Sequence, residues 1–465
     1  MGQGVAVVHG GVRRWLEDGP LRSILRSAGY LGSTKVLGAV FGLAALSMAG
    51  RSLGPTGFGL LVLVHTYALG ANALTNFQSW QLIVRYGSPA LIRGDHATVR
   101  SALSLSLALD LSSGMFGMVG AMILLPLIGP AFGIGPSLVV PALLYATIVP
   151  SMASATPTGA LRMLGRFDLM AAQQPVTPIV RCALAGVCWW TGAGLQWFML
   201  AWYAADLAGD AVLWAMAGTQ LRDRGLTRGL RPSFAAARSI PGAWRFVMGT
   251  NLSTTLGAGW GPVGNVIIGM ILGPAAAGVY KVAATIVDAA GKPADMLTKG
   301  FYPEVMKHDP RSPDPWRLGL RAGAIAGAAG MASTILVLAV GPAIIHGAFG
   351  DAYAKASTPL SIMILTLAVS MASFPLQSLL YLADRQRDAV SSQAISTAIY
   401  LATLAPFSVA MGLPGAALAH LVGTLASVAL MLRPVLHEWR LTSTSPAMPD
   451  EEEQPVQEPV MRAAA

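Results

Sequence analysis

Five charged residues between positions 281 and 299 form the most distinctive polar pattern in this 465-residue sequence. In an α-helix, at 100° per residue, all five fall within a stripe about 60° wide. The stripe extends over roughly 27 Å at 1.5 Å per residue, close to the hydrocarbon thickness of a bilayer. Three of its five charges are positive, so the stripe could attract an anionic group. Its members are Lys281, Asp288, Lys292, Asp295 and Lys299.

The stripe is expected to face a polar interior, because the residues around it are apolar. Facing lipid, it would cost on the order of 10 to 15 kcal/mol on insertion scales. Two interpretations remain open. The lysines could line a cavity and contact a substrate. Alternatively, Asp288 could pair with Lys292, and Asp295 with Lys299, each at i, i+4 spacing.

Other polar residues also fall inside apolar segments. Arg181 could bind a phosphate group bidentately, or it could pair with Asp206. His65 is either a hydrogen-bonded residue of a helix bundle or a proton-coupling group. Asp110, Asp206 and Asp210 could take up a proton or Na⁺ during transport, with pairing to an arginine as the alternative.

Arg51 and Arg85 lie at the predicted ends of apolar segments. They either extend to the membrane interface or enter a cavity. The seven histidines are scattered and do not suggest a metal site. The sequence contains no Walker-type phosphate-binding loop and no arrangement of nucleophile, histidine and acid. We therefore expect no metal, no cofactor and no enzymatic activity.

The elements that position these residues are predicted to be transmembrane helices. The chain is 54% hydrophobic and only 11% charged, whereas soluble domains average about 25% charged residues. About 20 apolar residues span a bilayer. The sequence predicts an all-α, polytopic protein with about twelve spans, at residues 30–50, 57–83, 101–125, 137–160, 169–191, 195–217, 246–272, 275–302, 318–345, 357–382, 389–411 and 413–432.

Lysine and arginine are concentrated in alternate connections, which predicts that both termini are cytoplasmic. The net charge of +9 is dispersed over helix ends, so we exclude nucleic acid as a partner. Five regions are expected: an amphipathic surface segment, two six-helix lobes joined by a basic linker, and an acidic disordered tail. The surface segment is residues 1–28 and the acidic tail is residues 437–465. The two lobes are residues 29–217 and 246–436, and the basic linker between them is residues 218–245.

The two lobes are predicted to be an internal repeat. Residues Gly50, Leu53, Gly54, Pro55 and Gly59 recur 219 positions later as Gly269, Leu272, Gly273, Pro274 and Gly278. At the same offset, Leu161 and Arg166 recur as Leu380 and Arg385. An offset of six spans keeps both copies in the same orientation. The copies should therefore be related by an axis along the membrane normal.

The repeated motifs resemble those of bacterial O-antigen and exopolysaccharide flippases, which belong to the multidrug/oligosaccharidyl-lipid/polysaccharide exporter superfamily. Arg51-Ser-Leu-Gly-Pro-Thr-Gly-Phe-Gly59 and Leu272-Gly-Pro-Ala-Ala-Ala-Gly-Val-Tyr280 resemble the repeated turn of that family. The turns Gln81–Gly87, Gly159–Phe167 and Phe349–Ala356 are similar to further family motifs. The resemblance covers about residues 28 to 436.

The resemblance implies two six-helix lobes around a central cavity in the bacterial inner membrane. It also implies a polyprenyl-pyrophosphate-linked oligosaccharide as the substrate, moved outward by alternating access. The implied partners are membrane lipids, a polysaccharide polymerase and chain-length proteins. Two alternatives remain: a drug/cation antiporter of the same superfamily, and a membrane polysaccharide polymerase or polyprenyl-dependent glycosyltransferase.

Overall fold

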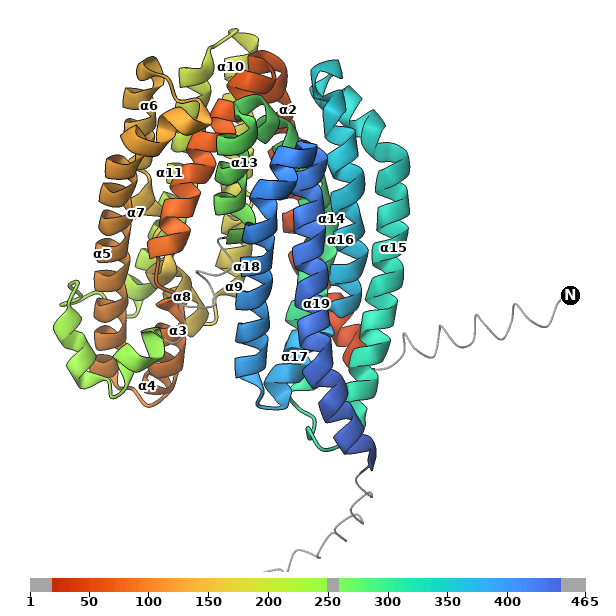
Figure 1. Ribbon diagram of the computed structural model, residues 1–465. Coiled ribbons are helices and arrows are strands. Elements are labelled where there is room, and N and C mark those ends of the chain that lie inside the picture. Colours follow the sequence, from red (N-terminus) through yellow and green to blue (C-terminus); the bar gives the residue numbers. More distant parts are fainter. Residues whose placement is uncertain (1–18, 249–258, 445–465) are drawn as a thin grey trace, which may run out of the picture.

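The computed structural model describes residues 19–248 and 259–444, and every regular element within these ranges is helical. This confirms the predicted all-α class. The helices form two bundles that stand side by side (Figure 1). We refer to residues 19–223 as the N-terminal bundle and residues 259–444 as the C-terminal bundle.

The N-terminal bundle begins with the long element α2 (Gly19–Thr75), which contains the first predicted span and most of the second. Several of the later spans are interrupted by short breaks. The remaining elements are α3 (Trp80–Leu82), η1 (Ile83–Gly87), α4 (Ser88–Ile92), α5 (His96–Ile128), η2 (Gly129–Phe132), α6 (Pro136–Ala146), α7 (Val149–Met152), α8 (Ala155–Met163), α9 (Phe167–Gln173), α10 (Val176–Trp190) and α11 (Leu195–Asp223).

The C-terminal bundle is built from longer, less interrupted helices. Its most charged member, α14 (Pro274–Val305), carries the stripe of lysines and aspartates. The other elements are η4 (Gly259–Val263), α13 (Gly264–Leu272), α15 (Asp314–Phe349), η5 (Asp351–Ala356), α16 (Ser357–Ser373), α17 (Pro375–Leu382), α18 (Gln386–Met411) and α19 (Leu413–Thr444).

Both bundles contain helices that are long and apolar enough to span a membrane. Within the described ranges, each of the twelve predicted spans has a helical counterpart, although residues 249–258 of the seventh lie outside them. The protein is therefore a polytopic membrane protein. Seven described segments are long and apolar enough to cross a bilayer by length and composition: Leu37–Thr75, His96–Phe132, Pro136–Met163, Asp314–Phe349, Asp351–Leu382, Gln386–Met411 and Leu413–Leu441.

Backbone geometry confirms the internal repeat. Gly54 interrupts α2 at φ 65° and ψ 175°, and Gly273 precedes α14 at φ 85° and ψ 171°. This region of φ/ψ space is open essentially only to glycine. In both copies a proline follows at the first position of the next helix, where its missing N–H is tolerated. The two Gly-Pro hinges are thus equivalent in sequence and conformation.

The second repeated motif also has the same local structure in both copies. Arg166 N–H donates to the Leu161 carbonyl at 2.9 Å, and Arg385 N–H donates to the Leu380 carbonyl at 2.8 Å. The residue before each arginine has a positive φ, 68° at Gly165 and 57° at Asp384. Each copy therefore ends its helix with the same left-handed cap.

The two hinges pack directly against each other. A Cβ atom added to Gly59 would lie 1.8 Å from the Pro274 carbonyl oxygen, and one added to Gly278 would lie 2.9 Å from the Pro55 carbonyl oxygen. Backbone therefore meets backbone at this point. The contact is reciprocal, because each copy uses the same glycine against the other copy's proline. It lies at the end of the molecule opposite α4 and α17 (Figure 1).

The basic connection predicted at residues 218–245 packs against the N-terminal bundle. It starts within α11 and contains the 3₁₀ turn η3 (Phe234–Ser239). Ala237 and Ile240 are buried in one cluster with Leu82 and Leu105. Contact with the side of one bundle explains why this segment is ordered despite its prolines and charges.

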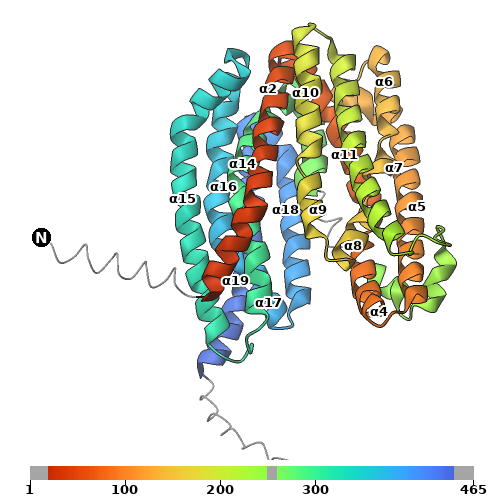
Figure 2. The same ribbon diagram turned by 180° about the vertical axis from the view of Figure 1, so that it is seen from behind.

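Both described ends of the chain lie at the same end of the molecule (Figure 2). The helix α2 already begins at Gly19, within the predicted N-terminal surface segment. The helix α19 continues to Thr444, beyond the predicted start of the acidic tail at residue 437. The rest of those two predictions, residues 1–18 and 445–465, falls outside the described residues.

Candidate functional site

The helix α14, which carries the stripe, packs against α2 of the N-terminal bundle. On this helix, Val282 and Ile286 are buried in the protein core. Lys281 and Lys292 are partly buried, and Asp288 is exposed. The polar interior expected for the stripe stays a prediction.

Self-pairing along the stripe does not occur where the side chains are described. Neither Lys281 nor Lys292 makes an ion pair with a described residue, and Asp288 is an exposed side chain without one. The predicted Asp288–Lys292 pair is therefore absent. The side chains of Asp295 and Lys299 lie outside the described part of the structure, so the second predicted pair is not placed.

A second polar cluster lies within the N-terminal bundle. Arg181 on α10 donates to Asp206 on α11, forming the ion pair predicted as the alternative to anion binding. His65 Nδ1 lies 2.8 Å from the Tyr145 hydroxyl and 3.5 Å from Asp206 Oδ2. The guanidinium of Arg181 also lies 5.4 Å from the ring centroid of Trp202. Four helical segments thus converge on one carboxylate.

Asp210 lies one helical turn beyond Asp206, and its surroundings differ. Its Oδ2 accepts a hydrogen bond from the Ser151 hydroxyl at 3.0 Å. Close by in the same bundle, the hydroxyls of Thr147 and Tyr203 are 3.1 Å apart. Among the described residues Asp210 has no arginine partner, so the pairing expected for the intramembrane aspartates is observed for Asp206 only.

Asp110 joins two interrupted spans. It is 1% exposed, and its Oδ1 accepts from the Ser79 hydroxyl at 3.0 Å. Its Oδ2 accepts from the backbone N–H of Thr156 at 2.7 Å, in the first turn of α8. The Ser106 hydroxyl bridges Ser79 and Thr156 at 2.8 and 2.9 Å. Asp110 therefore satisfies backbone and hydroxyl donors that the breaks before α3 and α8 leave free.

Arg51 lies at the hinge end of the molecule and connects the two bundles. Its Nε donates to the Ala348 carbonyl at 2.7 Å, and its Nη2 donates to the Gly347 carbonyl. Both acceptors belong to the last turn of α15, where a cation also complements the helix dipole. Beside it, the Tyr353 hydroxyl donates to the Gly50 carbonyl at 3.1 Å. Arg51 is therefore a contact between the bundles.

Arg85 lies near the opposite end, in the π-helical turn η1, and is exposed. Its guanidinium lies 4.7 Å from the ring centroid of Phe246 and 5.7 Å from that of Tyr86. Phe246 follows the basic connection, so Arg85 holds that connection against the bundle. The neighbouring turn contains Arg166, whose hydrogen bonds lower the pKa of the exposed Asp168 carboxyl to about 2.

Two aromatic clusters were not predicted from the sequence. Trp260 stacks on Tyr400, with ring centroids 4.8 Å apart, and His420 meets the Trp260 ring edge-on at 5.4 Å. In the other bundle, Arg162 lies 3.8 Å over the ring of Trp80. Each cluster joins residues from different helices, so no spacing along one helix could reveal it.

The polar sites described above consist mainly of charged side chains and the groups that pair with them. The described residues contain no group of three or more histidine, cysteine, aspartate or glutamate side chains that could hold a metal ion. Arg181 is neutralised by Asp206, whereas Lys281 and Lys292 carry positive charge without an ion-pair partner in the described residues. Asp288 lies between these lysines on the same helix and also makes no ion pair with a described residue, so the described part of the stripe has two basic side chains and one acidic one.

Comparison with solved structures identifies the fold. The chain aligns with an inward-facing multidrug resistance MATE family transporter of the MOP superfamily at a TM-score of 0.67 and 14% identity, covering 90% of this chain and all of that one. An outward-facing structure from the same family gives 0.64 at 14% identity, covering 93% and 98%. The Vibrio cholerae MATE transporter VcmN gives 0.61 at 13% identity, covering 91% and 99%. The protein thus has the MATE transporter fold.

Sequence comparisons identify the family. The family described as "Polysaccharide biosynthesis protein" matches residues 24–291, which is more than half of the chain. The inner membrane protein YghQ of Escherichia coli (strain K12) is 42% identical over 346 residues, covering 74% of this chain and 98% of the relative. On both grounds, this chain belongs to the polysaccharide biosynthesis protein family of membrane proteins, as its repeated turns indicate.

Proposed function

We propose that the protein moves an oligosaccharide linked to polyprenyl pyrophosphate across the bacterial inner membrane by alternating access. The observation that carries the proposal is that Lys281 and Lys292 make no ion pair with a described residue, on a helix that packs against α2 of the opposite bundle. A pyrophosphate is a compact anion, and a cationic surface between two bundles would attract it. Membership of the polysaccharide biosynthesis family supports the choice of cargo.

Within this proposal, the polar residues divide into two roles. Lys281 and Lys292 attract the pyrophosphate from the C-terminal bundle. The cluster of His65, Arg181 and Asp206, with Asp210 nearby, is the candidate for ion or proton coupling, because such carboxylates can exchange a cation. Coupling there would alter the charge that faces Lys281 across the two bundles.

The direction of transport follows from the predicted orientation. If both termini are cytoplasmic, the Gly-Pro hinges lie at the outer end, and the bundles are closed there. Release of the sugar outside then requires separation of the Gly59–Pro274 and Gly278–Pro55 contacts. Arg51 must also leave the carbonyls of α15 in that step. The transport cycle would break and remake this whole set of contacts.

A deletion strain tests the proposal. We expect surface polysaccharide to fall at least tenfold and lipid-linked repeat units to accumulate on the cytoplasmic face. Complementation by the wild-type gene should restore both. Normal export without accumulation would refute the assignment. Partner proteins, expected to be a polymerase and chain-length proteins, should co-purify from cross-linked membranes if they act on the exported repeat units.

The fold supports a second candidate, a drug/cation antiporter, because the solved structures with this fold are multidrug transporters. Asp206, Asp210 and Asp288 could then bind a cationic compound. A drug-susceptibility panel on the deletion strain distinguishes the two functions. Increased susceptibility with unchanged polysaccharide would favour the antiporter. A polymerase or glycosyltransferase activity would instead appear as incorporation of labelled sugar by the purified protein, and we expect none.

A further inference from the structure

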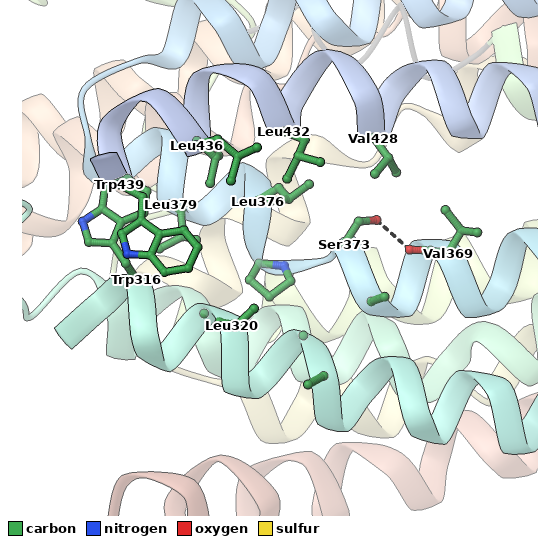
Figure 3. Close-up of a pocket in the computed structure, with 16 residues that line it drawn as sticks. Trp316, Leu320, Val369, Ser373, Leu376, Leu379, Val428, Leu432, Leu436 and Trp439 are labelled. Carbon is green, nitrogen blue, oxygen red and sulfur yellow. Dashed lines mark hydrogen bonds between the residues drawn. The ribbon is translucent and has the colours of Figure 1, made fainter. Parts of the chain in front are cut away.

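An apolar groove of about 510 Å³ lies on the C-terminal bundle, between α15, α19 and the α16–α17 pair (Figure 3). Leu320 and Leu432 line its sides, and Leu376 and Leu379 lie between them. Its one hydroxyl-bearing residue, Ser373, donates that hydroxyl to the Val369 carbonyl of its own helix at 2.8 Å. The groove therefore offers almost no free polar group to a ligand.

Glycines give the groove its shape. A Cβ atom on Gly323 would lie 2.7 Å from the Ala372 carbonyl oxygen, and one on Gly319 would lie 2.8 Å from the Leu379 side chain. The helix α15 can therefore approach α16 and α17 closely, as small residues permit in membrane helices. The glycines form the floor of the groove, while larger side chains form its walls.

The groove has a polar-interface end and a hydrocarbon end. Trp316 and Trp439 lie together at one end, where α15 begins and α19 is about to end, and Val428 lies at the other (Figure 3). Trp316 Nε1 donates to the Pro310 carbonyl in the preceding loop at 3.2 Å. Tryptophan is enriched at the membrane–water interface. From Trp439 to Val428 the helix rises about 16 Å, roughly half of the 30 Å hydrocarbon core.

Positive charge flanks the interfacial end. Arg317 follows Trp316 on α15 at this end. Its side chain is exposed and makes no ion pair with a described residue. A basic residue at this depth attracts anionic lipid head groups. An apolar groove one leaflet deep, with a cation at its mouth, matches the two parts of an anionic lipid.

We propose that this groove binds one acyl chain of an anionic phospholipid, with the head-group phosphate near Arg317. The depth of a single leaflet suits a phospholipid chain better than a long polyprenyl chain. Its location agrees, because every residue that lines the groove belongs to α15, α16, α17 or α19 of the C-terminal bundle. None belongs to α14 or to the N-terminal bundle, so the site is separate from the proposed transport path and does not depend on it.

Quenching of tryptophan fluorescence by brominated lipid tests the proposal. The purified full-length protein in detergent is titrated with phosphatidylglycerol that carries dibrominated acyl chains. We expect saturable quenching that unbrominated phosphatidylglycerol reverses and that falls by at least half in Trp439→Phe. Phosphatidylcholine with the same chains should bind at least fivefold more weakly, because it lacks a net negative charge.

Matched variants separate the groove from the rest of the apolar surface. Ala324→Phe fills the groove and should abolish the saturable component. Ala329→Phe adds the same ring to an exposed position on another face of α15 and should leave it intact. Arg317→Gln should weaken phosphatidylglycerol binding at least fivefold. The control Arg387→Gln removes the same charge from an exposed position at the start of α18, a helix that contributes no residue to the groove.

Three results would overturn the proposal. One is quenching that never saturates or is unchanged in Trp439→Phe and Ala324→Phe. Another is equal loss of binding in Arg317→Gln and Arg387→Gln, which would reduce the effect to general surface charge. The third concerns competition for the bound brominated phosphatidylglycerol. If polyprenyl phosphate displaces it at a lower concentration than unbrominated phosphatidylglycerol does, the groove would be assigned to the carrier lipid.

Discussion

Charged residues inside the bundles differ in whether the structure provides a counter-charge. Arg181 has Asp206 as a partner, with side-chain exposures of 19% and 12%. Lys292 has no ion-pair partner among the described residues. Removing a charge therefore has opposite consequences at the two positions. Loss of one partner leaves an uncompensated charge, whereas loss of an unpaired lysine removes a desolvation cost.

We therefore expect Lys292→Met to fold and insert normally but to reduce polysaccharide export at least tenfold. Lys292→Arg keeps the charge with different geometry and should retain partial activity. Arg181→Met should instead lower the free energy of unfolding by about 3 kcal/mol, because Asp206 is left unpaired. The double change Arg181→Met with Asp206→Leu should recover most of that stability. Protein level, thermal unfolding and export are measured for each variant.

An export rate for Lys292→Met equal to that of the wild type, at equal protein level, would contradict a role for this lysine in binding the pyrophosphate. Equal stability of Arg181→Met and the double variant would contradict the paired interpretation of Arg181. The two measurements are independent, because one concerns transport and the other concerns folding.

At this scale, the sequence predicted which residues are polar inside the membrane, and their helical spacing predicted the shared face of the stripe. It also named Asp206 as the alternative partner of Arg181. It could not predict the hydrogen bond between His65 and Tyr145, or the stacking of Trp260 on Tyr400. Those residues are 80 and 140 positions apart, and only the packing of several helices brings them together.

Among the helical elements, the two Gly-Pro hinges were the most predictable and the interrupted spans the least. Gly54 and Gly273 mark hinges because a positive φ excludes most other residues there. The break at residues 76–79 was missed, and the second span was predicted as continuous. At this break, the Ser79 hydroxyl donates to the Asp110 carboxylate from α5. A distant partner can stabilise a break that local propensity does not require.

The hinge contact leads to a prediction about closure. Gly59→Ala should force the bundles apart at this end, because the new Cβ would lie 1.8 Å from a carbonyl oxygen that cannot rotate away. The control is Gly42→Ala in the same element, where a Cβ meets nothing within 4 Å and helix propensity favours alanine. We expect the closed population to fall at least fivefold in Gly59→Ala and to be unchanged in Gly42→Ala.

Spin labels report that population. They are placed at Trp190→Cys and Lys355→Cys, two exposed positions on opposite bundles, in a protein whose Cys182 and Cys188 are replaced by alanine. A longer distance in Gly59→Ala supports the prediction. An unchanged distance distribution in that variant, with the protein folded, would show that the backbone contact does not limit closure.

For the whole molecule, the arrangement of the bundles predicts the effect of tying them together. Ser47 Oγ donates to the Ala348 carbonyl across the bundles. In the background without native cysteines, Ser47→Cys with Ala348→Cys should react with a short, reducible bifunctional thiol reagent. Export should then fall at least tenfold and return after reduction, because the hinge end must open in each cycle.

The control cross-link ties two helical segments of one bundle. Gly38 and Pro178 are adjacent in the N-terminal bundle, where a Cβ on Gly38 would lie 3.6 Å from Pro178 Cγ. The pair Gly38→Cys with Pro178→Cys should cross-link without loss of export. Full export with a complete Ser47–Ala348 cross-link would mean that the bundles do not separate at this end.

The reciprocal glycine–proline contact has a further consequence. Each half of the chain presents the same patch to the other, which is the form of an isologous interface between two copies in a two-fold dimer. Because one chain supplies both copies, they need to match only where they meet. Elsewhere each half is free to specialise: the N-terminal half holds a neutralised arginine–aspartate pair, while the C-terminal half holds lysines that have no such partner among the described residues. The single chain therefore combines a symmetric contact between its halves with different polar groups inside each half.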